Sequence, residues 1–174
     1  MIHVPPISNA KAKQEKLFYF VATAVAYRDG TCLLLQRSKH EIAHPGKYAP
    51  VGGKLEHKDL METPPTRMNG DVVDWEHMVE DLLVREAKEE CGLDVHDFRY
   101  LDSVVFRRPD GTPVVCTKFA CRAKPGDVVY PKDEFDGFAW VDAQTVDSHD
   151  CILGVPEEVK KTIEIFNTNT TPSS

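Results

Sequence analysis

The sequence predicts an α/β fold in which a mixed β-sheet lies between helices. Apolar runs rich in β-branched and aromatic residues, typical of strands, occur on both sides of one long amphipathic segment. In that segment the apolar residues recur at three- and four-residue intervals, which indicates a helix. A second segment with this periodicity follows near the C-terminus. Strands and helices in this order pack as a sheet covered by helices on both faces.

Length, composition and charge indicate one globular domain over residues 1–174, of which 41% are hydrophobic and 28% charged. The formal net charge of −7 argues against a nucleic-acid partner, because nucleic-acid binding usually needs a basic surface. It permits an anionic substrate beside a bound cation. The five cysteines form no CxxC pair, which argues against structural zinc and a disulfide framework.

The N-terminal extension 1–16 is polar and contains prolines, unlike a signal peptide. No apolar run approaches the length of a membrane span. We therefore expect a cytoplasmic location and no membrane partner.

The first part of the chain predicts a hairpin and a glycine-containing segment. Residues 17–27 are typical of a buried strand, and Asp29 and Gly30 supply a turn. Residues 32–37 then form the second arm. Residues 48–56 are a short extended segment interrupted by two glycines.

A break and a long helix follow. Residues 57–74 contain two prolines and a glycine, so they cannot form one continuous helix. Residues 74–91 have helical periodicity, with Asp74 as a possible N-cap and Gly92 suited to the position just past the end.

The last part predicts three strands and a second helix, over residues 98–108, 112–123, 136–143 and 155–166. An Asp-Gly turn at residues 110–111 joins the first two of these strands. The polar tail 167–174 is expected to be flexible.

Three glutamates crowd the end of the first helix, in the stretch "VREAKEECGL". At 100° per residue, Glu86, Glu89 and Glu90 occupy an arc of about 100°. Glu86 and Glu90 are like charges at i,i+4, which costs about 0.2–0.5 kcal/mol, and they lie at the end of the helix that disfavours anions. A hard divalent cation such as Mg²⁺ or Mn²⁺ would remove both penalties. A solvated acidic face is the alternative. Arg85 can pair with Glu89 at i,i+4 and hold its carboxylate.

A glycine pair precedes this helix. Gly52 and Gly53 would let the backbone approach a ligand or a cation, although such a pair can also be a plain turn. Lys54, the next residue, could contact a phosphate as a point charge.

Taken together, these segments resemble the Nudix hydrolases, whose box runs G-x5-E-x7-R-E-U-x-E-E-x-G-U, with U a bulky apolar residue. "REAKEECGL" at 85–93 resembles the second half of the box. "YAPVGGKLE" at 48–56 is similar to the segment that leads into it, and "LLLQR" at 33–37 to the preceding strand. "DEFDGFAWVDA" at 133–143 resembles a late acidic loop and its strand. The resemblance covers residues 18–166 and implies a Nudix-type α/β/α sandwich with a mixed β-sheet.

The box departs from the family pattern in its spacing. Counted from Gly53, its first glutamate falls at Asp59; counted back from Arg85, it falls at His77, 18 residues later. We therefore expect an insertion at about residues 58–75, which could form a lid or a homodimer contact or be a tolerated surface loop. Three acidic residues are candidates for the first box position: Asp59, Glu62 and Glu76.

The resemblance implies roles for the matching residues. Glu86 and Glu90 would bind the catalytic Mg²⁺, for which Mn²⁺ could substitute, and Glu89 would be a further ligand or bridge. The carbonyl of Gly52 could complete the ligand set. Arg85 would orient a carboxylate of the box.

Other residues are candidates for substrate contacts. By resemblance, Lys54 and Arg37 would contact phosphates. Tyr48, Phe18 and Phe20 could line a base-binding cleft, although Phe18 and Phe20, which share a strand face, could equally belong to the core.

The implied activity is Mg²⁺-dependent hydrolysis of a nucleoside diphosphate linked to another moiety. A nucleoside triphosphate is the first expectation, with release of a nucleoside monophosphate and pyrophosphate. Dinucleotides and nucleotide sugars such as ADP-ribose are alternatives, as is a non-catalytic ligand-binding module, although such modules typically lose the box acids. Glu134 resembles the late acidic residue that acts as general base or extra metal ligand, with Asp133 and Asp136 as alternatives.

Overall fold

A computed structural model describes residues 8 and 12–168 of the chain. Its main sheet has the strand order β3-β2-β1-β8-β7, with β4 paired to β1 and β9 to β2. β1 (Tyr19–Arg28) runs parallel to β8 (Pro113–Ala123), and the other pairings are antiparallel. The predicted mixed sheet is therefore confirmed. The other strands of this sheet are β2 (Thr31–Arg37), β3 (Tyr48–Ala49), β4 (Val51–Lys54), β7 (Val95–Arg107) and β9 (Phe135–Val141).

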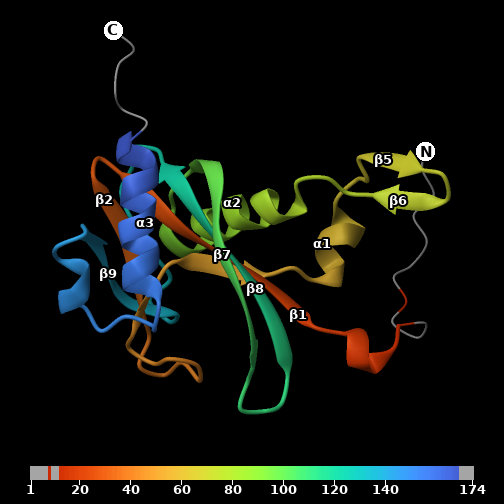
Figure 1. The fold of residues 1–174 in the computed structure, drawn as a ribbon, viewed down its shortest axis with the longest axis horizontal. Coiled ribbons are helices and arrows are strands. Elements are labelled where there is room, and N and C mark those ends of the chain that lie inside the picture. Colours follow the sequence, from red (N-terminus) through yellow and green to blue (C-terminus); the bar gives the residue numbers. More distant parts are fainter. Residues whose placement is uncertain (1–7, 9–11, 169–174) are drawn as a thin grey trace, which may run out of the picture.

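Helices α2 (Met78–Cys91) and α3 (Val155–Thr168) cover opposite faces of the sheet, as Figure 1 shows. Each helix packs on its own core cluster, one containing Leu83 of α2 and the other Phe166 of α3. This arrangement is the predicted α/β/α sandwich. None of the helices in the described part of the chain is long and apolar enough to cross a membrane.

Strand β1 separates the two cores because its side chains alternate between the faces of the sheet. Ala22, Ala24 and Ala26 lie in the cluster under α2, whereas Val25 and Tyr27 lie in the cluster under α3. The small alanine side chains leave room for α2 close to the strand.

Helix α2 begins later than the sequence predicts. Its first residue is Met78, because Val72–Asp74 forms β6 and pairs with β5 (Arg67–Asn69). The proposed N-cap at Asp74 is therefore wrong. The predicted end is confirmed: Gly92 adopts a φ of +73°, and its N–H donates to the Lys88 carbonyl oxygen at 3.1 Å.

The segment between the glycine pair and α2 is folded. Helix α1 (His57–Glu62) comes first, and the β5–β6 hairpin follows and projects beyond α1 at one end of the molecule (Figure 1). The indole Nε1–H of Trp75 donates to the Thr63 carbonyl oxygen at 2.9 Å and closes the base of the hairpin. The prediction that this segment is not one continuous helix is confirmed. Residues 1–7, 9–11 and 169–174 lie outside the described part, so the predicted N-terminal extension is only partly described and most of the predicted tail is not.

Candidate active site

The glycine pair and the glutamates of α2 meet, as the sequence predicts. The N–H of Gly52 in β4 donates to Oε2 of Glu90 at 3.0 Å. A Cβ at Gly53 would overlap the Glu86 carboxylate, so only glycine leaves room for that carboxylate against the strand. Neither glycine has a positive φ. The pair is therefore required for close approach between strand and helix, and not for a turn.

Burial makes the negatively charged form of the Glu86 and Glu90 carboxylates unfavourable. Burial, followed by the nearby charges of Glu86 and Glu134, raises the pKa of Glu90 to about 8, against the opposing effects of the Gly52 N–H and Arg37. Burial likewise raises the pKa of Glu86, against the Arg85 guanidinium. Glu89 is exposed, and its charge also raises the pKa of Glu86. A cation bound here would relieve this repulsion.

Arg85 joins the helix to a distant acid. Its Nη1 lies 2.5 Å from Oδ1 of Asp59, which is 26 residues away in the chain, and its Nη2 lies 3.2 Å from Oε1 of Glu86. The predicted pairing of Arg85 with Glu89 is therefore wrong, because a partner from α1 occupies the guanidinium. Burial alone would raise the pKa of the Asp59 carboxyl, but the N–H of Glu56 and the Arg85 guanidinium lower it below its usual value.

The structure distinguishes among the three acids that the sequence leaves open. Asp59 is buried, and its Oδ2 also accepts the N–H of Glu56 at 2.8 Å. Glu62 is exposed, and Glu76 pairs with Arg67 of the hairpin at 2.6 Å. Only Asp59 of the three is tied to Arg85, so the spacing from Gly53 is kept and the extra residues follow Asp59, later than the predicted start at residue 58.

Arg37, at the end of β2, and Glu134, just before β9, also lie near Glu90. Both are close enough for their charges to act on Glu90. The guanidinium of Arg37 is 2.8 Å from Glu41 and donates to the Ala43 carbonyl oxygen at 2.8 Å. Of the acids suggested as alternatives to Glu134, Asp136 accepts the N–H of Lys39 at 3.1 Å and Asp133 is exposed.

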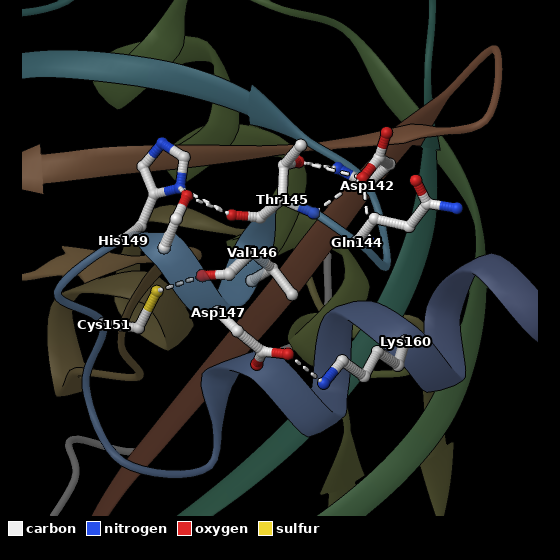
Figure 2. Close-up of polar contacts among 9 residues, drawn as sticks. Asp142, Gln144, Thr145, Val146, Asp147, His149, Cys151 and Lys160 are labelled. Carbon is white, nitrogen blue, oxygen red and sulfur yellow. Dashed lines mark hydrogen bonds and ion pairs between the residues drawn. The ribbon is translucent and has the colours of Figure 1, made fainter.

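Tyr48, another candidate for substrate binding, lies beside the core under α3 and not beside the glutamates of α2. Its ring packs edge-on against His149 at 5.0 Å, its hydroxyl is 3.5 Å from Oε1 of Gln36, and it borders the core under α3. Figure 2 shows how the neighbouring loop is fixed: Asp142 accepts hydrogen bonds from Thr145, whose carbonyl oxygen lies 3.1 Å from Nδ1 of His149. These contacts favour a packing role for Tyr48.

Lys54 and the other two aromatic candidates share an open groove of about 690 Å³. The lining includes Phe18 and Phe20 at the start of β1 and, after Lys54, the residues His57 and Lys58. The sequence did not single out His57 and Lys58. The only feature of the sequence that could have pointed to them is their position directly after the segment that contains Lys54 and Glu56.

The protein-family model of the NUDIX domain matches residues 19–159 of the sequence. The chain belongs to the NUDIX family. This family hydrolyses pyrophosphate linkages in nucleotide-like substrates and generally uses divalent cations. The chain is accordingly a NUDIX pyrophosphohydrolase. A search of curated proteins finds no match to the sequence.

Solved structures of NUDIX proteins have the same fold. The MutT NUDIX hydrolase of Burkholderia pseudomallei is 20% identical, with a TM-score of 0.58 over 86% of this chain and 98% of that one. The MutT protein of Methanosarcina mazei is 20% identical, with a TM-score of 0.59 over 92% and 100%. The Ap4A hydrolase of Caenorhabditis elegans, a binary complex, is 16% identical, with a TM-score of 0.58 over 87% and 98%. At these identities the similarity concerns the fold alone.

The donor set of this NUDIX site fits a loosely held divalent cation. Within the described residues, no three His, Cys, Asp or Glu side chains are grouped to enclose a metal ion. Mg²⁺ is usually bound through one or two carboxylates, with water and substrate phosphates as its other ligands. The partly buried Glu86 and Glu90, which repel each other, satisfy that requirement.

Asp59→Asn is expected to lower kcat/KM by about 10- to 100-fold, the usual effect of losing a group that supports a metal ligand. The reason is that Arg85 loses the charge that fixes it beside Glu86. Steady-state kinetics and the Mg²⁺ concentration for half-maximal rate measure this effect. Glu62→Gln and Glu76→Gln are matched controls that should behave like the wild type. Equal losses in all three variants would contradict the role given to Asp59.

Proposed function

We propose that this NUDIX protein is a Mg²⁺-dependent hydrolase of nucleoside triphosphates, with Mn²⁺ as a possible substitute, that releases a nucleoside monophosphate and pyrophosphate. The observation that carries the proposal is the position of Glu90. Its carboxylate is held against the Gly52 N–H beside Glu86, and burial and neighbouring acids raise its pKa to about 8. A buried acid among like charges is suited to a cation and is unfavourable without one.

Each residue of the site has a distinct task in this proposal. Glu86, Glu90 and the Gly52 carbonyl would hold the metal, with Glu89 as a further ligand. When bound, the cation neutralises phosphate oxygens and lowers the pKa of a coordinated water. Asp59 fixes Arg85, and Arg85 in turn fixes the carboxylate of Glu86.

The remaining residues act on substrate and proton. Lys54 and Arg37 contact the phosphates, which positions phosphorus for in-line attack. Glu134 takes the proton of the attacking water as general base. Its position supports this role, because it is exposed and yet close enough for its charge to act on Glu90.

A substrate screen tests the function. The purified protein is incubated with nucleoside triphosphates, dinucleoside polyphosphates and nucleotide sugars in Mg²⁺, Mn²⁺ or EDTA, and the products are separated by chromatography. We expect a monophosphate and pyrophosphate from at least one triphosphate, with no turnover in EDTA. Water labelled with ¹⁸O shows which phosphorus is attacked. If only dinucleotides or nucleotide sugars are hydrolysed, that class, and not the nucleoside triphosphates, is the substrate. Absence of turnover with either cation would overturn the catalytic proposal.

A further inference from the structure

The outer edge of the main sheet is regular along the second half of β7. This strand is the last in the sheet and, among the described residues, pairs only with β8. Its first half is irregular, because the pairing shifts register between His96 and Arg99 and again between Tyr100 and Asp102. Such irregularities hinder an edge strand from pairing with another chain. Residues 102–107 pair with β8 without a shift, so this stretch lacks that protection.

This stretch also exposes apolar side chains on both faces of the sheet. Val105 is 67% exposed, Phe106 45% and Val104 37%. Val105 lies on the same face as α2, since its neighbours across β8 and β1 are Val115 and Phe20, and the other two lie on the face of α3. Figure 1 shows that the β7–β8 hairpin extends beyond both helices. A long, regular and apolar edge of this kind favours pairing with another strand.

The backbone groups along this edge alternate in direction. The N–H of Arg108 donates to the Thr112 carbonyl oxygen at 2.9 Å, so these two residues form a hydrogen-bonded pair. Hydrogen-bonded and non-hydrogen-bonded pairs alternate along an antiparallel ladder. The N–H and carbonyl groups of Ser103, Val105 and Arg107 therefore point away from β8, toward the outside of the sheet.

This alternation and the charges favour one register for a second copy of the strand. In an antiparallel pair about a twofold axis, two residues opposite each other must both direct their backbone groups at the partner strand or both away from it. This condition is met when Val105 lies opposite Val105 of the second copy. Val104 is then opposite Phe106, and Asp102 is opposite Arg108. Apolar residues meet apolar residues and an acid meets a base, which stabilises cross-strand pairs.

The two neighbouring registers that satisfy the same condition are less favourable. A pair centred on Val104 would place Asp102 opposite the apolar ring of Phe106. A pair centred on Phe106 would place Asp102 opposite Asp110, and like charges directly opposite each other destabilise a sheet. The register centred on Val105 is therefore the one that the side chains of this edge select.

Two exposed polar contacts would change partner in that register. The N–H of Ser103 donates to Oδ1 of Asp102 at 2.8 Å and would instead donate to the second copy. Arg108 lies 3.1 Å from Asp110 and would turn to Asp102 of the second copy. Surface ion pairs contribute little to stability, so this exchange is not a large obstacle to pairing.

We propose that two copies of the chain associate through these edges, so that their sheets continue into each other through antiparallel β7 strands centred on Val105. The homodimer contact then lies on β7, and not on the inserted hairpin that the sequence offered as one possible contact. The paired stretch is short compared with a standard interface, so we expect a reversible dimer with a Kd on the order of 1–100 µM. The contact uses none of the residues assigned to catalysis or to substrate binding.

Sedimentation of the full chain, at concentrations below and above this range, measures the association. Val105→Lys places two lysines opposite each other at the twofold axis and should raise the Kd more than tenfold. Val72→Lys changes a valine that is 60% exposed on the inserted hairpin, so it is the matched control and should keep the wild-type Kd. Both variants should have the wild-type melting temperature at low concentration, which excludes misfolding as the cause.

Exchange of two charges tests the register. Asp102→Arg and Arg108→Asp each place like charges opposite each other, and the pair occurs twice in the dimer, so each variant should raise the Kd about 5- to 10-fold. The double variant restores the pair with its charges reversed and should recover the wild-type Kd. Amide hydrogen exchange of residues 103–107 should slow as the wild-type concentration rises, and should not do so in Val105→Lys.

Each outcome of these measurements decides a specific point. A wild type that stays monomeric at every concentration overturns the proposal, as does a dimer that Val105→Lys leaves intact. A dimer that only Val72→Lys dissociates moves the contact to the inserted hairpin and also overturns it. Loss of affinity in both single charge variants without recovery in the double variant overturns the register. No substrate is used in these measurements, so the proposed function can fail without affecting them.

Discussion

Glu90→Gln is expected to lower kcat by a factor on the order of 10³, the scale reported when a group that stabilises transition-state charge is removed. Glutamine keeps the shape of the side chain, and its amide oxygen can still accept the Gly52 N–H that Glu90 accepts at 3.0 Å. What the substitution removes is the negative charge beside Glu86. Steady-state kinetics with the nucleotide identified by the screen measure the loss, and Mg²⁺ titrations measure the accompanying loss of affinity.

The same substitution is expected to stabilise the metal-free protein at alkaline pH. In the folded chain the pKa of Glu90 is about 8, above its ordinary value of 4.5. The folded state therefore binds this proton more tightly than the unfolded state, and stability falls as the pH rises from about 4.5 to about 8. Glu90→Gln lacks this contribution, so its advantage over the wild type should grow across that range and then level off. Thermal unfolding in EDTA at several pH values measures the difference.

Added Mg²⁺ provides the second half of this experiment. It should raise the melting temperature of the wild type most at high pH, where Glu90 is ionised, and should raise that of Glu90→Gln much less. Glu164→Gln, an exposed acid on α3, is the control and should match the wild type in rate and in melting temperature. An active Glu90→Gln enzyme, or one that Mg²⁺ stabilises fully, would contradict the proposed metal site.

The grouping of Glu86 and Glu90 can be predicted because the information for it is local: helical periodicity places both on one face of α2. The glycine pair predicts a close approach of the backbone to a ligand or cation, and the structure shows that the group packed against Gly53 is the Glu86 carboxylate. The partner of Arg85 could not be predicted in this way. Helix geometry compares only residues on the same element, and Asp59 reaches Arg85 from α1 across the inserted hairpin.

The start of α2 was mispredicted for a related reason. The sequence predicts a helix from residue 74, but Asp74 is the last residue of β6, in which residues 72–74 pair with residues 67–69 across Gly70 and Asp71. A Gly-Asp pair between two short extended segments is a recognised hairpin signal, and Gly70 has the positive φ of +65° that such a turn requires. The position of Tyr48 depended instead on which face of the sheet β3 presents to α3, and that follows from pairing along the whole sheet.

Gly53→Ala is expected to give a folded protein whose kcat is lower by about 10²-fold or more. The added methyl group would overlap the Glu86 carboxylate, which is the far end of a flexible side chain. The carboxylate can move aside at little cost in stability, but it then leaves its position beside Gly53 and Arg85. We expect a melting temperature in EDTA close to that of the wild type, together with weaker Mg²⁺ binding and slower turnover.

Substitution of the adjacent Gly52 should lower stability, whereas substitution of Gly53 should lower activity, so the two variants can be compared directly. A Cβ at Gly52 would press on backbone, with Thr23 Cα at 2.9 Å and the Ala22 carbonyl oxygen closer still, so relief requires β1 and β4 to separate. Gly52→Ala is therefore expected to lose about 1–3 kcal/mol of stability or more. Gly126→Ala, where the nearest atom would be 3.4 Å from the new methyl group, is the control for loss of glycine itself. If Gly53→Ala unfolds as readily as Gly52→Ala, or keeps full activity, then Gly53 does not act by making room for the Glu86 carboxylate. Loss of activity without loss of stability at Gly53 alone would show that the second glycine serves the catalytic site, while the first serves the sheet.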